Sequence, residues 1–440
     1  MPGGSPGGGG KPDGAPGPRG RTRRLSPCRA LRSAATLLLL LAAGSATEAG
    51  AQSVRPHGPW RSVESPHFHL AFRAELEQLV PHALQAAEFA WDSLARALPP
   101  PEGRIDLVLD DAHDQANGFG GPFPGNHVIL WAAPPVDEPT LAFYDDWWRV
   151  LLCHELTHVF ALDRTGRLGR IGRAVLGRVP SSWPLFPVVR SPGWAIEGVP
   201  VLHESRFTGY GRLHGSWHEM AVRTAILEGR FDPIDRASNA AASWPAGRRP
   251  YIYGSLFLGR LAREGGPDAG ARLTEAAAAA TLPAPVFFDR LGRSALGRNF
   301  TEEWRAWQED LERRYGAWSD SLRALGVTTG ERLAGGYFTA HPRVSPDGKT
   351  VVFYGSDGRT PAGLHRFDPE TGNTRRLCDW HSESPVAWLA DGGLLAGRLE
   401  AVDAYEERTE LVRLDAKGGL RDRFSGERLR EPDEIGRAHV

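Results

Sequence analysis

Residues 151–160, "LLCHELTHVF", place two histidines and a glutamate inside a run that is otherwise apolar. The run has the composition of a buried helix, where three polar side chains are costly unless each one is paired. His154 and His158 are four residues apart, so a helix brings both to the same face. The segment is therefore predicted to be a buried helix whose three polar side chains need an interaction partner, and a metal ion is one such partner.

The spacing of these residues is the His-Glu-x-x-His motif of zinc sites. His154 and His158 can both reach one Zn²⁺ from the same helical face. Glu155 is rotated away from that pair, where it can act as a general base toward the water that attacks a substrate carbonyl. The alternative is that both histidines are hydrogen-bonded residues of the core.

A catalytic zinc site needs a third protein ligand, and the sequence offers it downstream. The metzincin pattern fails, because Ala161 and Arg164 occupy the positions where it has glycine and a third histidine. Glu197 lies in "PGWAIEGVPVLHES", which can form a second helix. His203 and Glu204 compete with Glu197, which its Trp-x-x-Glu-Gly context favours. Glu204 then suits a partner that orients a zinc-binding histidine.

Four stretches of the chain together resemble the peptidase MA-like domains of bacterial exported proteins, which have the gluzincin arrangement of zinc ligands. They are "DLVLDDAHDQANGFGG", "DWWRVLLCHELTHVFALD", "PGWAIEGVPVLHES" and "RRPYIYGSLF", and the likeness spans residues 60–320. The resemblance implies that His154, His158 and Glu197 bind Zn²⁺. Glu155 is then the general base. It also implies that "HVILWAA" is an edge strand beside the cleft, where an extended peptide could pair.

The resemblance extends to function and to one further catalytic residue. Tyr253, in "YIYGS", stands where related gluzincins have a tyrosine that stabilises the oxyanion; a packing role is the alternative. We expect a zinc metallopeptidase that hydrolyses peptide bonds. An endopeptidase is favoured, because the Gly-x-Met-Glu-Asn signature that binds a free amino terminus is absent. The alternative function is a catalytically silent exported protein that uses a peptidase-like scaffold for binding.

The first 51 residues predict export. Residues 1–18 are rich in glycine and proline and do not suit a packed core. An arginine-rich stretch, the apolar run "SAATLLLLLAAG" and a small-residue cleavage site at 49–51 follow, which is the order of a secretory signal peptide. The apolar run is shorter than the roughly 20 residues that span a bilayer, and an uncleaved signal anchor is the alternative. We therefore expect a periplasmic or secreted protein.

Hydrophobic patterns predict an α+β fold for residues 52–330, with a small sheet followed by helices. "HFHLAF", "RIDLVLD" and "HVILWAA" have the pattern of strands, and a glycine-rich loop separates the last two. Residues 81–98 and 141–162 are predicted as helices. From 193 to 325 the pattern is helical. This arrangement is mainly helical and consistent with a zincin-like domain.

Near residue 330 short β segments replace the helical pattern, which predicts an all-β domain over 331–434. Residues 342–358 and 385–401 share an apolar–turn–apolar layout, and their Asp-Gly turns are 44 residues apart. That interval suits one four-stranded propeller blade, and "SPDGKTVVF" resembles the repeats of TolB-type β-propellers. Two blades cannot close a ring, which needs about four to eight, so we expect a truncated propeller. Residues 435–440, "IGRAHV", match a reading frame of a sequencing adapter and are expected to be an artefact.

Charge argues against nucleic acid as a partner, since the formal net charge is −1. The expected partners are a peptide or protein substrate and a further protein bound by the propeller. Residues 164–178, "RTGRLGRIGRAVLGR", carry five arginines separated by apolar residues and could lie on a membrane surface. Four glycines in the same stretch weaken a helix. A solvated loop over the cleft is therefore favoured.

Overall fold

A computed structural model of the 440-residue chain describes residues 54–432, with gaps at 136–137, 240–242, 281–287, 329, 383, 425 and 427. Residues 52–440 form one compact unit. The predicted signal peptide and the final six residues lie outside the described residues. Within the described residues, each helix is too short or too polar to cross a bilayer.

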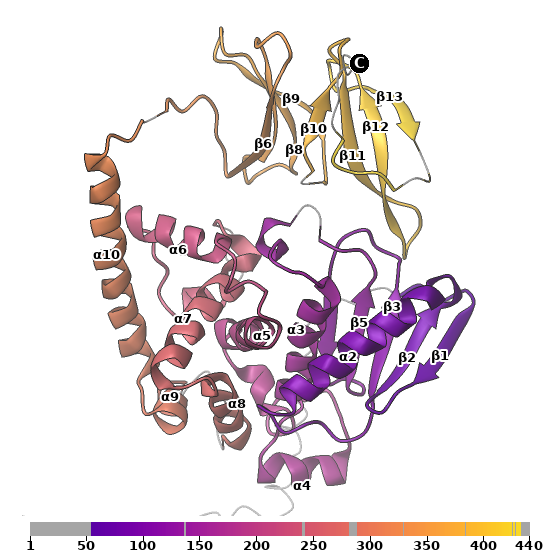
Figure 1. Ribbon diagram of the computed structural model, residues 1–440, viewed down its shortest axis with the longest axis vertical. Coiled ribbons are helices and arrows are strands. Elements are labelled where there is room, and N and C mark those ends of the chain that lie inside the picture. The colour runs from indigo at the N-terminus through magenta and orange to yellow at the C-terminus, as the bar shows by residue number, and fades with distance from the viewer. Residues whose placement is uncertain are drawn as a thin grey trace, which may run out of the picture. The chain divides into compact units, whose positions relative to one another are not determined.

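The chain is α+β, as predicted, and begins with a five-stranded mixed sheet (Figure 1). The strand order is β1-β2-β3-β5-β4. Strands β2, β3 and β5 are parallel, while β1 and β4 run antiparallel at the two edges. The bounds are Trp60–Glu64 (β1), Phe68–Arg73 (β2), Ile105–Asp110 (β3), Gly118–Gly121 (β4) and His127–Trp131 (β5).

Strand β4 corrects two expectations. The glycine-rich stretch between β3 and β5 contains a strand, and "HVILWAA" (β5) lies between β3 and β4 instead of at an edge. The physical reason is a close approach between β4 and helix α3, Trp147–Leu162. A Cβ on Gly120 would lie 2.2 Å from the carbonyl oxygen of Glu155. Glycine therefore allows this strand to cover β5 and to reach the helix that carries the histidines.

Helix α3 lies between the sheet and helix α5, and it is buried almost throughout (Figure 1). From Trp147 to Ala161 every residue except Arg149 is buried. The helix starts later than residue 141, because the Asp146 side chain caps it by accepting hydrogen bonds from the backbone N–H groups of Trp148 and Arg149. A helix enclosed on all sides explains the apolar composition of the motif segment.

Helices α5 (Gly193–Thr208) and α7 (Arg249–Gly265) cross at two glycines. A Cβ on Gly198 would lie 2.6 Å from the carbonyl carbon of Gly254, and one on Gly254 would lie 2.0 Å from the carbonyl oxygen of Trp194. The helices can approach this closely only without side chains at those positions. This crossing brings the start of α7 beside the middle of α5.

Further helices complete this part of the chain. They are α2 (Val80–Leu94), α4 (Arg167–Leu176), α6 (Trp217–Leu227), α8 (Ala269–Ala279), α9 (Phe288–Leu296) and α10 (Phe300–Ala324). Short 3-10 helices span Ala74–Leu79, Pro139–Leu141, Pro187–Arg190, Arg236–Ser238 and Ala246–Arg248. Helix α4 replaces the solvated loop that the sequence favours for residues 164–178. The glycines of this segment do not prevent the helix, because they pack closely against the rest of the protein.

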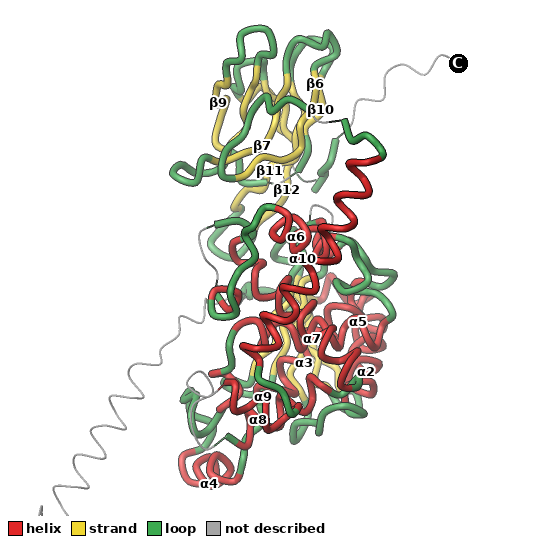
Figure 2. The backbone as a smooth tube through the Cα atoms, turned by 90° about the vertical axis from the view of Figure 1, so that its left-hand side faces the viewer, coloured by secondary structure: helices red, strands yellow, loops and turns green. Residues whose placement is uncertain are grey.

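Residues 338–424 form two four-stranded antiparallel sheets, β6-β7-β8-β9 and β10-β11-β12-β13, the unit expected for propeller blades. Both Asp-Gly sites are turns, with positive φ at Gly348 and Gly392. In Figure 2 the strands of these two sheets form a separate group at the top of the view. Their bounds are Phe338–Val344, Val351–Ser356, Gly363–Phe367, Thr374–Asp379, Val386–Trp388, Leu394–Ala401, Glu407–Leu414 and Leu420–Phe424.

The loop after β3 contacts strand β12 through a buried carboxylate. Asp114 is 1% exposed and accepts hydrogen bonds from the backbone N–H of Thr409 at 2.6 Å and from Nε of Arg428 at 2.8 Å. The backbone N–H of Glu407 also donates to the carbonyl oxygen of Ala112. A buried carboxylate is stable only when paired, and here its partners are the backbone of β12 at Thr409 and the side chain of Arg428, which follows β13. The sheet is therefore held on the loop by a specific contact.

Candidate metal centre

Three side chains from α3 and α5 converge at one point. His154, His158 and Glu197 each offer a ligand atom, and these atoms lie within 4.8 Å of one another. The Oε2 atom of Glu197 is 3.7 Å from Nε2 of His154 and 3.4 Å from Nε2 of His158. The i, i+4 spacing on α3 supplies the histidines, and the crossing of α5 supplies the carboxylate.

The chemistry of this group fits a divalent metal such as Zn²⁺. Two imidazole nitrogens and one carboxylate oxygen form a donor set typical of catalytic zinc. Oε2 of Glu197 is buried and has no hydrogen-bond donor among the described residues, a costly state for a carboxylate. Burial alone raises the pKa of this carboxyl, but the positive charges of His158 and His154 outweigh burial and lower it. The group can therefore hold a cation with Glu197 ionised.

Glu204, one of the competing third ligands, instead contacts the opposite side of His154. Its Oε2 atom is 2.7 Å from Nδ1 of His154 and accepts a hydrogen bond from Nη1 of Arg212 at 3.1 Å. Burial and Arg212 lower the pKa of His154, while Glu197 and Glu204 outweigh them and raise it to about 9. Glu204 therefore sets the orientation of the ring and leaves Nε2 facing Glu197.

Substituting Glu204 with glutamine is expected to weaken zinc binding by about 10- to 100-fold, because the neutral amide is a poorer partner for His154 Nδ1. Competition with a chromophoric chelator measures the affinity. Glu264→Gln, at an exposed glutamate on α7, is the matched control and should leave the affinity unchanged. An unchanged affinity for Glu204→Gln would contradict the positioning role.

His203, the other competing ligand, lies apart from the group. It is fully buried, its Nδ1 is 3.5 Å from Oγ1 of Thr157, and its ring packs on Phe207. Burial lowers the pKa of His203 to about 4. This histidine is a neutral residue of the helix interface.

Glu155 follows His154 on α3 and faces strand β4. A Cβ on Gly118 would lie 3.0 Å from Cγ of Glu155. Burial is the largest cause that raises the pKa of the Tyr251 hydroxyl, and the carboxylates of Glu197 and Glu155 raise it further. Glu155 thus lies beside the three-residue group, within electrostatic range of Tyr251.

The two tyrosines of "YIYGS" occupy different environments. Tyr253 is 2% exposed, packs on Trp304, and its hydroxyl accepts the backbone N–H of Asp232. Tyr251 instead stacks on His154, with ring centroids 6.0 Å apart, and the nearby charge of Glu197 helps to raise the pKa of its hydroxyl. The structure therefore brings Tyr251 to the metal group and places Tyr253, the residue named from the sequence, in the core.

A signal for this difference was present in the sequence. Residues two apart on a helix point about 200° away from each other. Tyr253 shares a face with Phe257 four residues later, and both are buried. The buried face of α7 that contains Tyr253 and Phe257 therefore does not include Tyr251. Tyr251 lies on the other face of the helix, toward the metal group.

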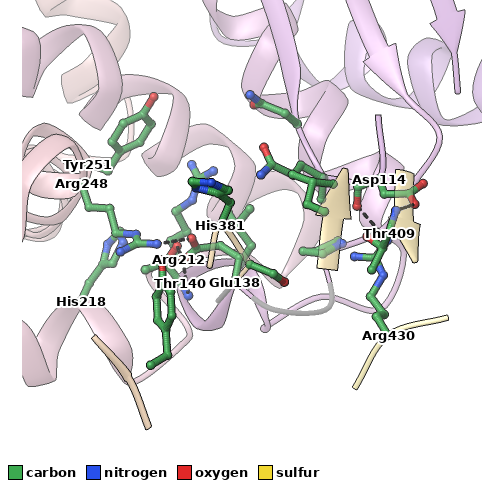
Figure 3. A pocket seen from close by; sticks show the side chains of 18 residues that line it. Asp114, Glu138, Thr140, Arg212, His218, Arg248, Tyr251, His381, Thr409 and Arg430 are labelled. Carbon is green, nitrogen blue, oxygen red and sulfur yellow. Dashed lines mark hydrogen bonds and ion pairs between the residues drawn. The ribbon is translucent and has the colours of Figure 1, made fainter. Parts of the chain in front are cut away.

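A cavity of about 410 Å³ is lined by Tyr251 and Arg212, among other residues (Figure 3). The three ligand side chains do not line it, but Tyr251 and Arg212, which contact them, do. Some of the other lining residues precede the sheets of residues 338–424, namely Glu138, His218 and Arg248. Others lie in or just after those sheets, namely His381, Thr409 and Arg430. The volume lies in the range of sites that bind small ligands.

No family model and no curated protein matches the chain. Among solved structures, TolB from Acinetobacter baumannii is similar over 24% of this chain and 27% of that one, at 21% identity and a TM-score of 0.22. Yeast LTA4 hydrolase with bestatin is similar over 62% and 40%, at 16% identity and a TM-score of 0.30. Native yeast LTA4 hydrolase is similar over 53% and 36%, at 18% identity and a TM-score of 0.31.

The matched region thus spans 27% to 40% of the length of these solved structures. Their TM-scores are too low to carry an argument about the chemistry of the site, which therefore rests on the residues of this chain. His154, His158 and Glu197 form a group that could bind a metal ion in a mixed α+β chain.

Proposed function

We propose that the protein is an exported zinc metallopeptidase that hydrolyses internal bonds of extended peptides. One observation carries this proposal: the Nε2 atoms of His154 and His158 meet a buried oxygen of Glu197 that has no donor among the described residues. A bound cation would satisfy this oxygen. The adjoining Glu155 can act as a general base and Tyr251 can stabilise an oxyanion, which are the two roles that peptide hydrolysis needs.

The roles of the side chains follow from their positions. When bound, Zn²⁺ supplies Lewis acidity and makes water a better nucleophile. Glu155 accepts the proton of the attacking water and returns it to the leaving amine. Glu204 holds the ring of His154 through Nδ1. Together these groups cover the proton transfers of peptide hydrolysis.

Strand β4 is the proposed binding edge for the substrate. It lies at the free edge of the sheet and packs against α3 at Glu155. An extended peptide can add to such an edge through main-chain hydrogen bonds, largely independently of its side chains. This mode places an internal peptide bond next to the general base and supports an endopeptidase.

The test uses residues 52–440, the compact unit of the chain. We expect one zinc per chain, hydrolysis of unstructured peptides, loss of activity on chelation and recovery when zinc is restored. His158→Ala should lose zinc, whereas His69→Ala, at an exposed strand histidine, should keep it. A folded protein without zinc affinity would refute the proposal. Stoichiometric zinc without cleavage of any peptide would favour the silent binding protein.

Replacing Tyr251 with phenylalanine is expected to lower kcat by about 10²- to 10³-fold, because one donor to the oxyanion is lost. KM and zinc content should change little. Tyr253→Phe is the matched control, since that hydroxyl accepts the backbone N–H of Asp232 in the core, away from the metal group. Steady-state kinetics on one peptide measures both. Equal losses for the two variants would contradict the role of Tyr251.

A further inference from the structure

Helix α4 directs its apolar side chains toward solvent. Leu168, Ile171 and Val175 share one face through spacings of three and four residues, and they are 53%, 55% and 77% exposed. Leu176 at the end of the helix is 61% exposed. A surface helix normally turns such a stripe toward the core. A continuous exposed stripe instead marks a surface that binds something.

Glycines explain why the helix lies this way round. A Cβ on Gly169 would lie 2.4 Å from the carbonyl oxygen of Pro184, and one on Gly172 would lie 2.5 Å from Cδ2 of Leu185. These two residues form the face that contacts the protein. The helix therefore packs through its smallest residues, which leaves the large apolar side chains on the outside.

The exposed face is also held in a fixed position. Arg173 donates to the carboxylate of Asp163 and to the carbonyl oxygen of Leu185, and its guanidinium lies 3.8 Å from the ring centroid of Phe186. Arg178 donates to the same carboxylate at 2.9 Å. Asp163 directly follows α3. Because these contacts anchor α4 at its inner side, its exposed apolar face is a stable feature of the fold.

The charges around the stripe are positive. Residues 164–178 contain five arginines and no acidic residue. Arg164 pairs with Glu275, and Arg173 and Arg178 share Asp163. Arg167 and Arg170 are exposed on α4, next to the apolar side chains. An apolar stripe bordered by arginines matches the boundary between the headgroups and the acyl chains of a bilayer that contains anionic lipids.

We propose that α4 binds the surface of membranes that contain anionic lipids. The helix lies at the lower end of the helical part in both views (Figures 1 and 2), so a flat surface can reach it. Leu168, Ile171 and Val175 enter the acyl boundary, while Arg167 and Arg170 remain at the phosphate groups. A groove on a protein partner would not need the exposed arginines Arg167 and Arg170 beside the stripe. The proposal concerns a lipid surface and does not depend on peptidase activity.

Vesicle co-sedimentation of residues 52–440 tests the proposal. Vesicles of phosphatidylcholine with phosphatidylglycerol should bind the protein, and those of phosphatidylcholine alone should bind it more weakly. The Ile171→Asp, Val175→Asp double variant should reduce the partition coefficient more than tenfold, since it removes two inserted apolar side chains. Arg167→Gln and Arg170→Gln should each reduce it about fivefold, and only with anionic vesicles.

Leu325→Asp is the matched control, because Leu325 is 83% exposed at the end of α10. It should bind vesicles like the wild type. Circular dichroism and zinc content should be the same for all variants, since the changed side chains are exposed. Wild-type protein that binds neither vesicle, or binding that the α4 variants leave unchanged, would overturn the proposal. So would a dimer in solution that Ile171→Asp, Val175→Asp dissociates, because the face would then belong to a second copy.

Discussion

Glu155→Gln is expected to reduce kcat for peptide hydrolysis by about 10²- to 10⁴-fold, the usual effect of removing a general base. Glutamine has nearly the same shape as glutamate, so it keeps the packing of Glu155 against β4 but cannot accept the proton of the attacking water. Zinc content should stay at one per chain, because Glu155 is not among the three ligand residues. Metal analysis and steady-state kinetics on the same preparation measure the two effects.

The control is Glu275→Gln, at a glutamate that pairs with Arg164 away from the metal group. This variant should keep its full rate. A residual rate within about tenfold of wild type in Glu155→Gln would assign the proton transfer to another group. Loss of zinc in the same variant would instead make Glu155 a ligand and change the arrangement proposed above.

Arg249→Met is expected to lower the free energy of unfolding by about 3–5 kcal/mol. Arg249 is 1% exposed, and its Nε donates to Oδ2 of Asp232 at 2.7 Å. Asp232 is 7% exposed, so methionine leaves a nearly buried carboxylate without its closest charge partner. Nη2 of Arg249 also holds the carbonyl oxygens of Ser243 and Trp244. Urea unfolding followed by tryptophan fluorescence measures the loss.

A matched control is available on the same carboxylate. Arg236 lies 3.2 Å from Oδ1 of Asp232 but is 52% exposed, so Arg236→Met should cost less than about 1 kcal/mol. Adding Asp232→Leu to Arg249→Met should restore part of the stability, because no buried charge then remains. Equal losses for the two arginine variants would show that burial of the pair does not determine its contribution.

The ligand group and the two β-sheets were predictable because their signals are local. The spacing of His154 and His158 is a property of one helix, and each Asp-Gly turn lies within one sheet. Glu197 required only that a second helix cross the first. What sequence could not predict was the sheet edge, because β4 is defined by its contact with α3.

The corrections at β4 and at α4 both concern glycine-rich stretches. From sequence alone glycine predicts a loop, because it weakens isolated helices and strands. In each case a distant backbone occupies the space that a side chain would need: the carbonyl oxygen of Glu155 faces Gly120, and that of Pro184 faces Gly169. Such contacts join segments far apart in sequence or across a turn, so local propensity does not reveal them.

The contact of Asp114 with Thr409 and Arg428 bears on how this chain can be cut or recombined. The composition changes near residue 330, but the carboxylate lies 295 and 314 residues from its two donors in sequence, on the opposite side of that point. A chimera joined near residue 330 would pair a buried aspartate with foreign neighbours unless the loop at 111–114 and the strand from Glu407 were exchanged together. The two regions therefore have to be exchanged together.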